Sequence, residues 1–374
     1  MKKVLAENTT DVFVVGGGPA GLAAAIAARR KGLSVVLADG AAPPIDKPCG
    51  EGMMPGTQDA LRELGVEVPA GAGYRFCGIR FVQGKHEVAA DFPEGHGVGI
   101  RRPLLHGLLV ERAEKCGVKF FWKTPVTGIF GERVQLSKGA VRARWIIGAD
   151  GGGSRVRRWS KLDCARQRKE RSAGRRHYRV KPWTDHMEIY WGERAQAYVT
   201  PISGEEVCIV VMAEEAKDAN LETALEGLPE LRERLANAES DNRERGAISA
   251  MHSLRSVARG NVALVGDASG GVDAITGEGL RLAFRQALAV ADAMEAGDLG
   301  GYERVHRRLA RRPIWMGKLM LQLGRNGRMR RRAMKILGQR PELFSRLLAI
   351  HVGHAKPGEW LATGAELGWE FLAA

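Results

Sequence analysis

The chain has 374 residues, of which 44% are hydrophobic and 27% charged, which is typical of a globular protein with a full core. No run approaches the ~20 apolar residues of a membrane-spanning helix, and no signal peptide precedes the first expected strand, so we expect a cytoplasmic protein. The net charge is +14, but no zinc finger or aromatic RNA-reading strand accompanies it, so we expect no nucleic-acid partner.

The N-terminal segment has the pattern of a βαβ unit. Residues 11–15 predict a buried strand, 19–31 an alanine-rich helix, and 34–39 a second buried strand. Pro19 lies where a helix tolerates proline, and Gly32 ends the helix. The elements expected next are a helix at 57–64, short strands within 74–92, a helix at 101–118, and strands at 119–122, 126–130 and 141–149.

The middle of the chain predicts an antiparallel sheet. Residues 186–191 predict a strand and 196–212 a β-hairpin, whereas the basic segment 165–180 is expected at the surface. The remaining expectations are a helical stretch at 217–237, a strand at 261–266, a helix at 279–296, and helices from 301 onward.

This order of elements predicts an α/β protein with two domains. A Rossmann-like domain with a mostly parallel sheet would be assembled from separate segments, and a smaller antiparallel-sheet domain would bind the substrate. The expected boundaries are 1–75, 98–165 and 255–300 for the first domain, 76–97 and 166–254 for the second, and 301–374 for a C-terminal helical region.

A glycine motif joins the first strand to the first helix. Gly16, Gly18 and Gly21 form G-x-G-x-x-G, with Pro19 and Ala20 inside it. One glycine makes the tight turn, one lets the backbone approach a pyrophosphate, and one lets helix and strand pack closely. Asp39 lies at the end of the second strand, where an acid accepts hydrogen bonds from ribose hydroxyls. The motif therefore predicts a dinucleotide site.

Two later motifs indicate which dinucleotide binds. "IIGADGGGSRVRR" places Asp150 after a strand, and "GNVALVGDASGG" places Gly266 and Asp267 after another. Gly277, Glu278 and Gly279 then stand at the start of a helix. The positive end of that helix would stabilise negative charge on a reduced flavin, which a nicotinamide enzyme does not need.

These three motifs, in this order, resemble the flavoprotein superfamily of p-hydroxybenzoate hydroxylase and geranylgeranyl reductase, over roughly residues 10–300. The resemblance implies bound FAD, with NAD(P)H as a transient electron donor. It implies contacts to the ADP half from the glycine motif and Asp39, and to the ring from residues 277–279. Arg101 would lie near the pyrophosphate, Val126 near the adenine, and Asp267 near the ribityl chain, while Asp150 belongs to a stretch with a dual role in the superfamily.

The resemblance leaves the reaction open. "GGVDAITGEG" lacks the proline typical of aromatic hydroxylases and is closer to the reductases, and "KPCGEG" (47–52) is also similar to a reductase segment. We therefore favour reduction of a C=C bond by hydride from flavin N5 on an isoprenoid, polyketide or aromatic substrate. An NAD(P)H-dependent flavin monooxygenase and a non-catalytic electron carrier remain as alternatives.

The segment "KPCGEGMMP" (47–55) is expected beside the flavin. The five cysteines and nine histidines show no metal spacing, so we expect neither a metal nor a disulfide, and Cys49 lacks an assignable base for a nucleophile's role. Cys49 and Glu51 are the candidate catalytic residues, with Glu51 either orienting the turn or donating a proton. The candidate walls of the substrate pocket are Met53, Tyr190, Tyr198 and Pro201.

The last seventy residues add a candidate surface. In "IWMGKLMLQLGRNGRMRRR" (314–332) a run with Trp315 and methionines is followed by Arg325, Arg328 and Arg330 to Arg332. Ordinary helix packing explains this pattern, and so does contact with an anionic membrane surface. Peripheral membrane association through the basic C-terminal helices is therefore one of two expectations for this segment, and the sequence does not define an oligomeric state.

Overall fold

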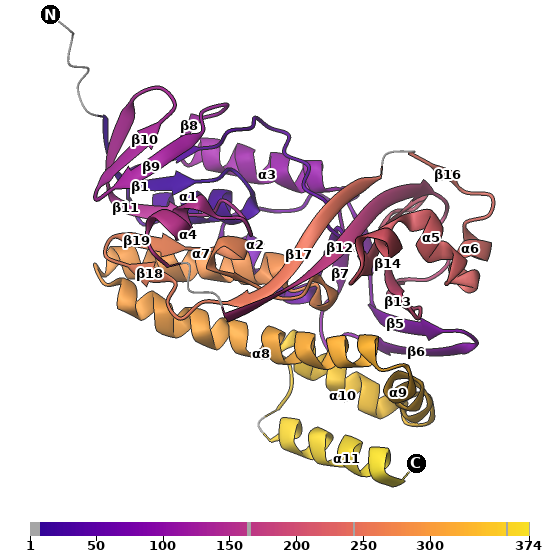
Figure 1. Cartoon of the computed structure of the whole chain (residues 1–374). Helices are drawn as coiled ribbons and strands as arrows, with labels where there is room; N and C mark the ends of the chain where they lie inside the picture. Colours follow the sequence, from indigo (N-terminus) through magenta and orange to yellow (C-terminus); the bar gives the residue numbers. More distant parts are fainter. Residues whose placement is uncertain (1–7, 163–165, 242–243, 357, 374) are drawn as a thin grey trace, which may run out of the picture.

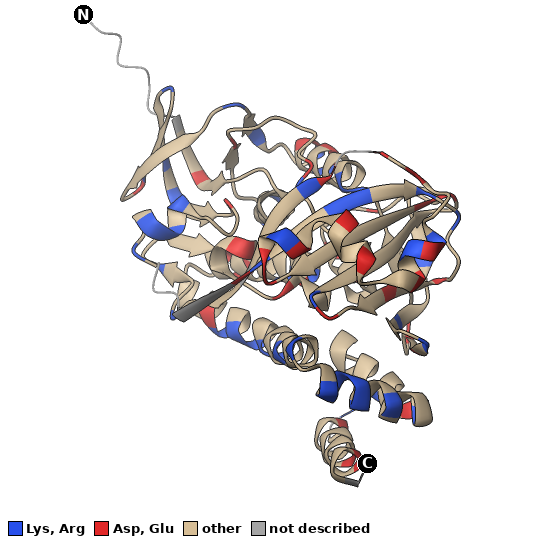
Figure 2. Cartoon of the chain, turned by 45° about the vertical axis from the view of Figure 1, so that its right-hand side comes forward, with Lys and Arg blue, Asp and Glu red and all other residues tan. Residues whose placement is uncertain are grey.

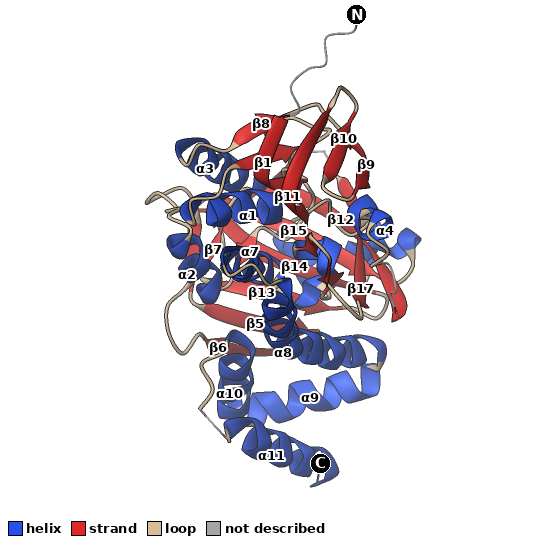
Figure 3. Ribbon diagram, turned by 90° about the vertical axis from the view of Figure 1, so that its left-hand side faces the viewer, coloured by secondary structure: helices blue, strands red, loops and turns tan. Residues whose placement is uncertain are grey.

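The computed structural model describes residues 8–162, 166–241, 244–356 and 358–373. Two large sheets lie side by side, and C-terminal helices run along one side of both (Figure 1). Figure 3 shows helices gathered on the outer face of the first sheet and below the second. Among the described residues, no helix combines the length and apolar composition that crossing a bilayer requires.

The first sheet has a parallel core in the order β18-β19-β11-β1-β2-β8. The strands β1 and β11 pair in parallel along their length, and a β9–β10 hairpin extends the sheet. Its bounds are β1 (Asn8–Val15), β2 (Val35–Ala38), β8 (Lys119–Phe121), β9 (Val126–Phe130), β10 (Arg133–Leu136), β11 (Ala140–Gly148), β18 (Ala258–Arg259) and β19 (Val262–Leu264). The β-branched run of β1 is fully buried, as expected for a central parallel strand.

Helices cover both faces of this sheet. On one face α1 packs against α3 and α7, because alanines at 23–28 allow close approach and are buried. The other face buries the β9–β10 hairpin and α4. The helix bounds are α1 (Pro19–Arg30), α2 (Pro55–Glu63), α3 (Arg102–Lys115), α4 (Arg155–Trp159) and α7 (Gly279–Glu295). The mixed α/β, flavoprotein-like fold expected from the motif order is confirmed.

The second sheet is mostly antiparallel, in the order β20-β17-β12-β15-β14-β13-β5-β6. Its bounds are β5 (Gly78–Gln83), β6 (His86–Asp91), β12 (Arg166–Arg179), β13 (His186–Trp191), β14 (Ala195–Ser203), β15 (Glu206–Ala213), β17 (Arg245–Ser253) and β20 (Gly270–Gly271), with β16 (Glu239–Ser240) paired to β12. A small third sheet contains β3 (Gly52–Met53), β4 (Tyr74–Phe76) and β7 (Gly97–Gly99).

The two faces of the second sheet pack against different helices. One face buries α5 (Leu221–Glu226) and α6 (Pro229–Arg234), with the short turn η1 (Ala216–Ala219) beside them. The other face packs against the C-terminal helices. These are α8 (Leu299–Arg325), α9 (Gly327–Gln339), α10 (Pro341–Val352) and α11 (Glu359–Ala373), while η2 (Gly266–Ser269) and η3 (Ala274–Thr276) lie before α7.

The structure adds to or differs from the local expectations at three places. The basic segment expected at the surface forms β12, a central strand in which Arg171 and Arg175 are buried. Burial is possible because Arg171 pairs with Asp273 (Nη1–Oδ1 3.1 Å) and Arg175 with Asp46 (Nη2–Oδ2 2.9 Å). The stretch 217–237 is broken into η1, α5 and α6, with Pro229 beginning a new helix, and β17 was not anticipated.

Candidate functional site

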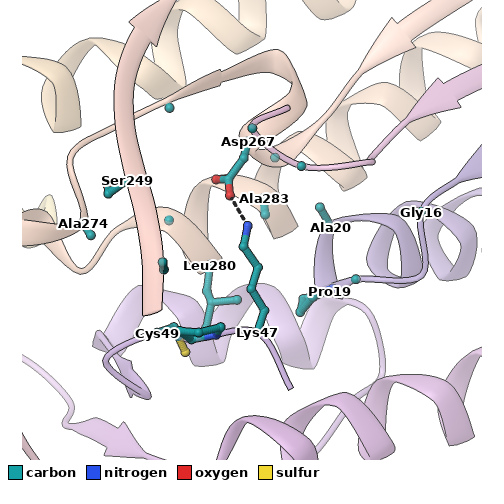
Figure 4. Close-up of a pocket in the computed structure, with 18 of the residues that line it drawn as sticks. Gly16, Pro19, Ala20, Lys47, Cys49, Ser249, Asp267, Ala274, Leu280 and Ala283 are labelled. Atoms are coloured by element: carbon teal, nitrogen blue, oxygen red, sulfur yellow. Dashed lines mark hydrogen bonds and ion pairs between the residues drawn. The ribbon is translucent and has the colours of Figure 1, made fainter. Parts of the chain in front are cut away.

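A cavity of about 800 Å³ lies between the carboxyl ends of the parallel strands and one face of the second sheet (Figure 4). Open α/β sheets bind ligands at this edge, because loops and helix N-termini converge there. The cavity thus brings together residues far apart in sequence. Of the predicted site residues, the lining includes Gly16, Gly18, Pro19, Ala20, Asp39, Cys49, Glu51, Val126, Asp150, Tyr198, Gly266, Asp267, Gly277 and Gly279.

The glycine motif forms a backbone cradle at one end of the cavity. Gly16 has φ +111°, and a Cβ there would lie 2.5 Å from the carbonyl oxygen of Ala149. Gly21 does not line the cavity, because it packs so tightly on Gly16 that a Cβ would collide with the Gly16 carbonyl. Gly18 faces open space, and no side chain caps the start of α1. The first N–H groups of α1 are therefore available to an anion.

Asp39 fixes the shape of this cradle. Its Oδ2 accepts a hydrogen bond from the Gly17 N–H (2.6 Å), and its Oδ1 accepts one from the Ala41 N–H (2.7 Å). His106, a residue not predicted from sequence, contacts the same loop, with Nε2 2.9 Å from the Gly17 carbonyl oxygen. A carboxylate has lone pairs to spare, so Asp39 can also accept from a sugar hydroxyl.

The start of α7 forms a second wall. Gly277 adopts φ +64°, and a Cβ there would lie 2.6 Å from Met54 Cε. Gly279 and Leu280 line the cavity, so the positive end of α7 faces it. Negative charge that develops on a ligand at this wall would be stabilised.

Glu278 differs from its neighbours. It does not line the cavity and is fully buried, paired with Arg281 and lying 3.8 Å from Arg312 Nη2. Its side chain therefore anchors the start of α7 to α8, and only the flanking glycines face the cavity.

Asp150 holds the turn that follows β11. Its Oδ1 accepts from the Ser154 hydroxyl (2.5 Å), and its Oδ2 accepts from the N–H groups of Arg155 (2.7 Å) and Val156 (3.1 Å). Three hydrogen bonds to this one carboxylate are thus made within the turn. This places Asp150 in a structural role at the cavity edge.

An ion pair spans the cavity between Lys47 and Asp267, whose Nζ and Oδ2 are 2.9 Å apart (Figure 4). Desolvation raises the pKa of the Asp267 carboxyl, but the Lys47 ammonium together with Arg102 and His252 outweighs this effect, so its pKa lies below the ordinary value. Asp267 is therefore ionised at neutral pH and can accept hydrogen bonds from a polyol chain. Lys47 was not among the predicted site residues.

The segment from Cys49 to Glu51 forms another part of the cavity lining. Cys49 lines the cavity and none of the four described cysteines forms a disulfide; Cys164 lies outside the described residues. Glu51 has φ +57°, uncommon for a residue with a side chain, and is buried. The backbone at this turn is therefore held by contacts of the Glu51 side chain.

Those contacts form a buried charged network. Glu51 Oε1 accepts from the Arg102 N–H (2.9 Å) and lies 3.2 Å from Arg175 Nη1, and its Oε2 lies 2.7 Å from His177 Nε2. His177 Nδ1 lies 3.2 Å from Asp241 Oδ2. Three partners hold both oxygens of this carboxylate, so the geometry supports an orienting role for Glu51.

One face of the second sheet provides an apolar wall, from Met187, Tyr198, Val210 and Met212. Tyr190 does not line the cavity. Side chains alternate along a strand, so Tyr190 faces the opposite side of the sheet, where it packs with the α5–α6 core and donates to Glu188 Oε2 (3.1 Å). The aromatic pattern of the two strands did not distinguish these faces.

Three further predicted residues lie outside the lining. Arg101 precedes α3 and binds Glu206 (Nε–Oε2 3.2 Å), and its neighbour Arg102 lines the cavity in its place. Met53 is buried in the hydrophobic core beside the first sheet, and Pro201 packs its carbonyl against Gly99. The lining residues missed from sequence include Lys47, Arg102, Arg175, Met187, Val210, Met212 and His252.

This donor set fits FAD. The uncapped start of α1 and open space at Gly18 suit a diphosphate, Asp39 suits a ribose, Asp267 suits a ribityl chain, and the start of α7 suits a ring that gains negative charge. The sequence matches the family described as "FAD binding domain" over residues 9–297. The chain belongs to this family. It is a FAD-dependent oxidoreductase of the superfamily that includes hydroxylases and geranylgeranyl reductases.

Members of the superfamily similar to this FAD-binding protein differ in activity. A menaquinone reductase of Mycobacterium tuberculosis is 28% identical over 320 residues, 78% of each chain. A digeranylgeranylglycerophospholipid reductase of Methanothermobacter thermautotrophicus is 27% identical over 343 residues, 81% of this chain and 84% of that one. The solved structure of a flavoprotein/dehydrogenase from Cytophaga hutchinsonii has a TM-score of 0.80, with 18% identity and 93% of each chain covered, which shows the shared fold.

Proposed function

We propose that this protein reduces a C=C bond in the isoprenoid chain of a hydrophobic substrate, with NAD(P)H as the electron donor. The observation that carries the proposal is that a single cavity joins the FAD-holding segments to the apolar wall of Met187, Tyr198, Val210 and Met212. Apolar and aromatic walls suit a hydrocarbon substrate. The similarity to two reductases over about four fifths of the chain supports reduction as the reaction.

The cavity residues would have distinct roles in this reaction. Bound FAD would supply the hydride to one carbon of the double bond. The N-terminus of α7 would stabilise the negative charge of the reduced flavin before hydride transfer, and the Glu51 network would hold the Cys49 turn in place. The apolar wall would exclude water and orient the chain.

The second carbon of the double bond needs a proton. Cys49 and Tyr198 carry a thiol and a phenol proton in the lining, whereas the Lys47 ammonium is paired with Asp267 and His252 lies against Arg157. Burial raises the pKa of Tyr198, and its hydroxyl already donates a hydrogen bond to Gln196 Oε1 (3.0 Å). The Tyr198 hydroxyl proton is therefore engaged within the second sheet and is a poor proton source for the substrate. We therefore assign proton donation to the Cys49 thiol, on the segment that enters beside the FAD-holding residues.

The test uses the FAD-loaded protein, reduced with dithionite without oxygen. Geranylgeraniol is a suitable probe because it carries isoprenoid double bonds and no quinone ring, so flavin reoxidation reports C=C reduction alone. A prenylated naphthoquinone is the second probe, analysed by mass spectrometry after air exposure. Air returns a quinol ring to the quinone, whereas a reduced double bond keeps its two added hydrogens.

Reoxidation of the flavin by either probe with a mass gain of two hydrogens supports the proposal. A product that gains an oxygen atom only when oxygen is admitted would overturn it and favour a monooxygenase. Stoichiometric FAD with no product from either probe under both conditions would overturn it in favour of an electron carrier. Parallel reductions with NADPH and NADH test the donor.

A further inference from the structure

The last helix, α11, exposes an apolar stripe. Leu361, Trp369 and Leu372 have exposed fractions of 82%, 70% and 84%, values unusual for large hydrophobic side chains. The positions 361, 365, 368 and 372 recur at helical spacing, and all are apolar residues classed as exposed. No described residue therefore covers the outer face of α11.

The inward side of α11 carries both apolar and acidic residues, and Leu367 and Phe371 pack there against the core of the C-terminal helices. Glu366 and Glu370 bind Arg340 on the adjoining segment, with Oε1 2.7 Å from Nη2 and Nη1 respectively, and Glu366 also binds Arg346 (2.7 Å). Thr363 on the same side is buried. Ion pairs thus fix α11 to α10 with its apolar stripe outward.

A basic and aromatic region of α8 adjoins the stripe. The Trp315 ring lies 5.1 Å from the Trp360 ring, and both tryptophans are partly exposed. Arg311 and Lys318 stand one helical turn to either side of Trp315, are exposed, and form no ion pair with any described residue. Figure 2 shows Lys and Arg along these C-terminal helices, whereas α11 carries none.

The same helices contact the wall of the cavity. His351 at the end of α10 bonds through Nε2 to the Thr276 carbonyl oxygen (2.8 Å), and Arg312 on α8 lies 3.8 Å from Glu278. Both acceptors directly flank Gly277, which lines the cavity. The exposed stripe is therefore attached to the cavity wall through packed helices.

We propose that the outer face of α11, together with Arg311, Trp315 and Lys318, docks on the surface of an anionic lipid bilayer. Exposed tryptophan and leucine side chains enter the boundary between headgroups and acyl chains, while flanking cations bind anionic headgroups. The unpaired basic residues beside an apolar stripe favour this occupant over a second copy, which would bring like charges together. The reason for docking rests on the proposed function, because an isoprenoid substrate dissolves in lipid.

The experiment is cosedimentation of the FAD-loaded full chain with vesicles, without substrate. Vesicles of phosphatidylcholine with phosphatidylglycerol should bind the protein more than phosphatidylcholine alone, and salt should weaken binding. Trp369→Ser with Leu372→Ser should weaken binding about ten-fold or more. Arg311→Glu with Lys318→Glu should remove the preference for phosphatidylglycerol.

Matched controls lie on another part of the molecule. Phe130→Ser removes an aromatic side chain that is 69% exposed on β9, and Lys138→Glu changes an exposed charge in the turn after β10. Neither should alter vesicle binding. Circular dichroism and FAD content identify any variant that fails to fold.

Three outcomes would overturn the proposal. The first is equal vesicle binding of the stripe variants and the parent, and the second is binding that phosphatidylglycerol does not improve. The third is a parent protein that does not bind vesicles but is a dimer in light scattering, which the stripe variants convert to monomer. The last result would assign the stripe to a second copy. Geranylgeraniol reduction measured without vesicles separates failure of the proposed function from failure of docking.

Discussion

Two glycines of the same motif should respond differently to one added methyl group. Gly16 has φ +111°, and a Cβ there would lie 2.5 Å from the carbonyl oxygen of Ala149, which directly follows β11. Gly18 has φ −71° and ψ 176°, which any residue adopts, and a Cβ would have no atom within 4 Å. Gly16→Ala is therefore a folding perturbation, and Gly18→Ala is a ligand-site perturbation.

The magnitudes follow from these geometries. Alanine at position 16 carries the strain of a positive φ, about 1–3 kcal/mol, and overlaps backbone that must shift, about 1–3 kcal/mol more. We expect the free energy of unfolding to fall by about 3 kcal/mol. Alanine at position 18 should leave it within about 1 kcal/mol of the parent, because its backbone is unstrained. Its methyl group would occupy the space where a diphosphate approaches the backbone, so FAD affinity should fall about ten-fold, or about 1.4 kcal/mol.

The assay is urea unfolding of FAD-free protein, followed by titration with FAD monitored by flavin fluorescence. Gly16→Ala should shift the unfolding midpoint, and Gly18→Ala should shift only the affinity. The reasoning is refuted if Gly18→Ala binds FAD as tightly as the parent, because the glycine cradle would then not hold the cofactor. A normal unfolding midpoint for Gly16→Ala would refute the steric argument.

The remaining predictions concern a buried charge, a thiol and a histidine. Glu51→Gln should lower the free energy of unfolding, measured in urea, by about 3 kcal/mol, because Arg175 loses a buried partner. As a control, Glu239→Gln in an exposed ion pair should change this free energy little. Equal effects of the two substitutions would contradict the buried network. Cys49→Ser should keep FAD affinity in fluorescence titration but slow geranylgeraniol reduction at least ten-fold; an unchanged rate would remove Cys49 as proton donor. Burial lowers the pKa of His306 to about 4, whereas the unfolded state keeps the ordinary value of about 6.5. Between these two pH values only the unfolded state gains a proton, so the free energy of unfolding decreases as the pH falls. Urea unfolding should lose about 2 kcal/mol between pH 7 and pH 5 from this group, and the loss should disappear in His306→Gln; an equal loss in that variant would exclude His306 as the cause.

Local pattern was sufficient for much of the first sheet and its helices. The strand β1, the glycine turn and α1 follow from a buried β-branched run, three glycines and an alanine-rich helix, all within one short segment. The same holds for the motifs around Asp150 and Asp267, because each depends on a strand and the turn directly after it. Their order along the chain was enough to indicate the family.

The second sheet was harder to predict, because its strands depend on distant partners. The basic segment 165–180 contains the charges of a surface loop, and nothing nearby in sequence shows that Asp46, Glu51 and Asp273 neutralise them. Tyr190 and Tyr198 were equivalent as strand aromatics. Only the pairing register decides that Tyr198 faces the cavity and Tyr190 the α5–α6 core.

The sequence by itself determined the kind of cofactor site, because the glycine cradle and the helix starts are built from contiguous residues. Tertiary structure alone decided that Glu51 is tied by three donors, that Lys47 meets Asp267 across the cavity, and that α11 turns its acids inward. Each of these depends on the positions of two charged groups brought together from distant segments. Charge pairing acts over a few ångströms in space, whereas sequence patterns report only neighbours along the chain.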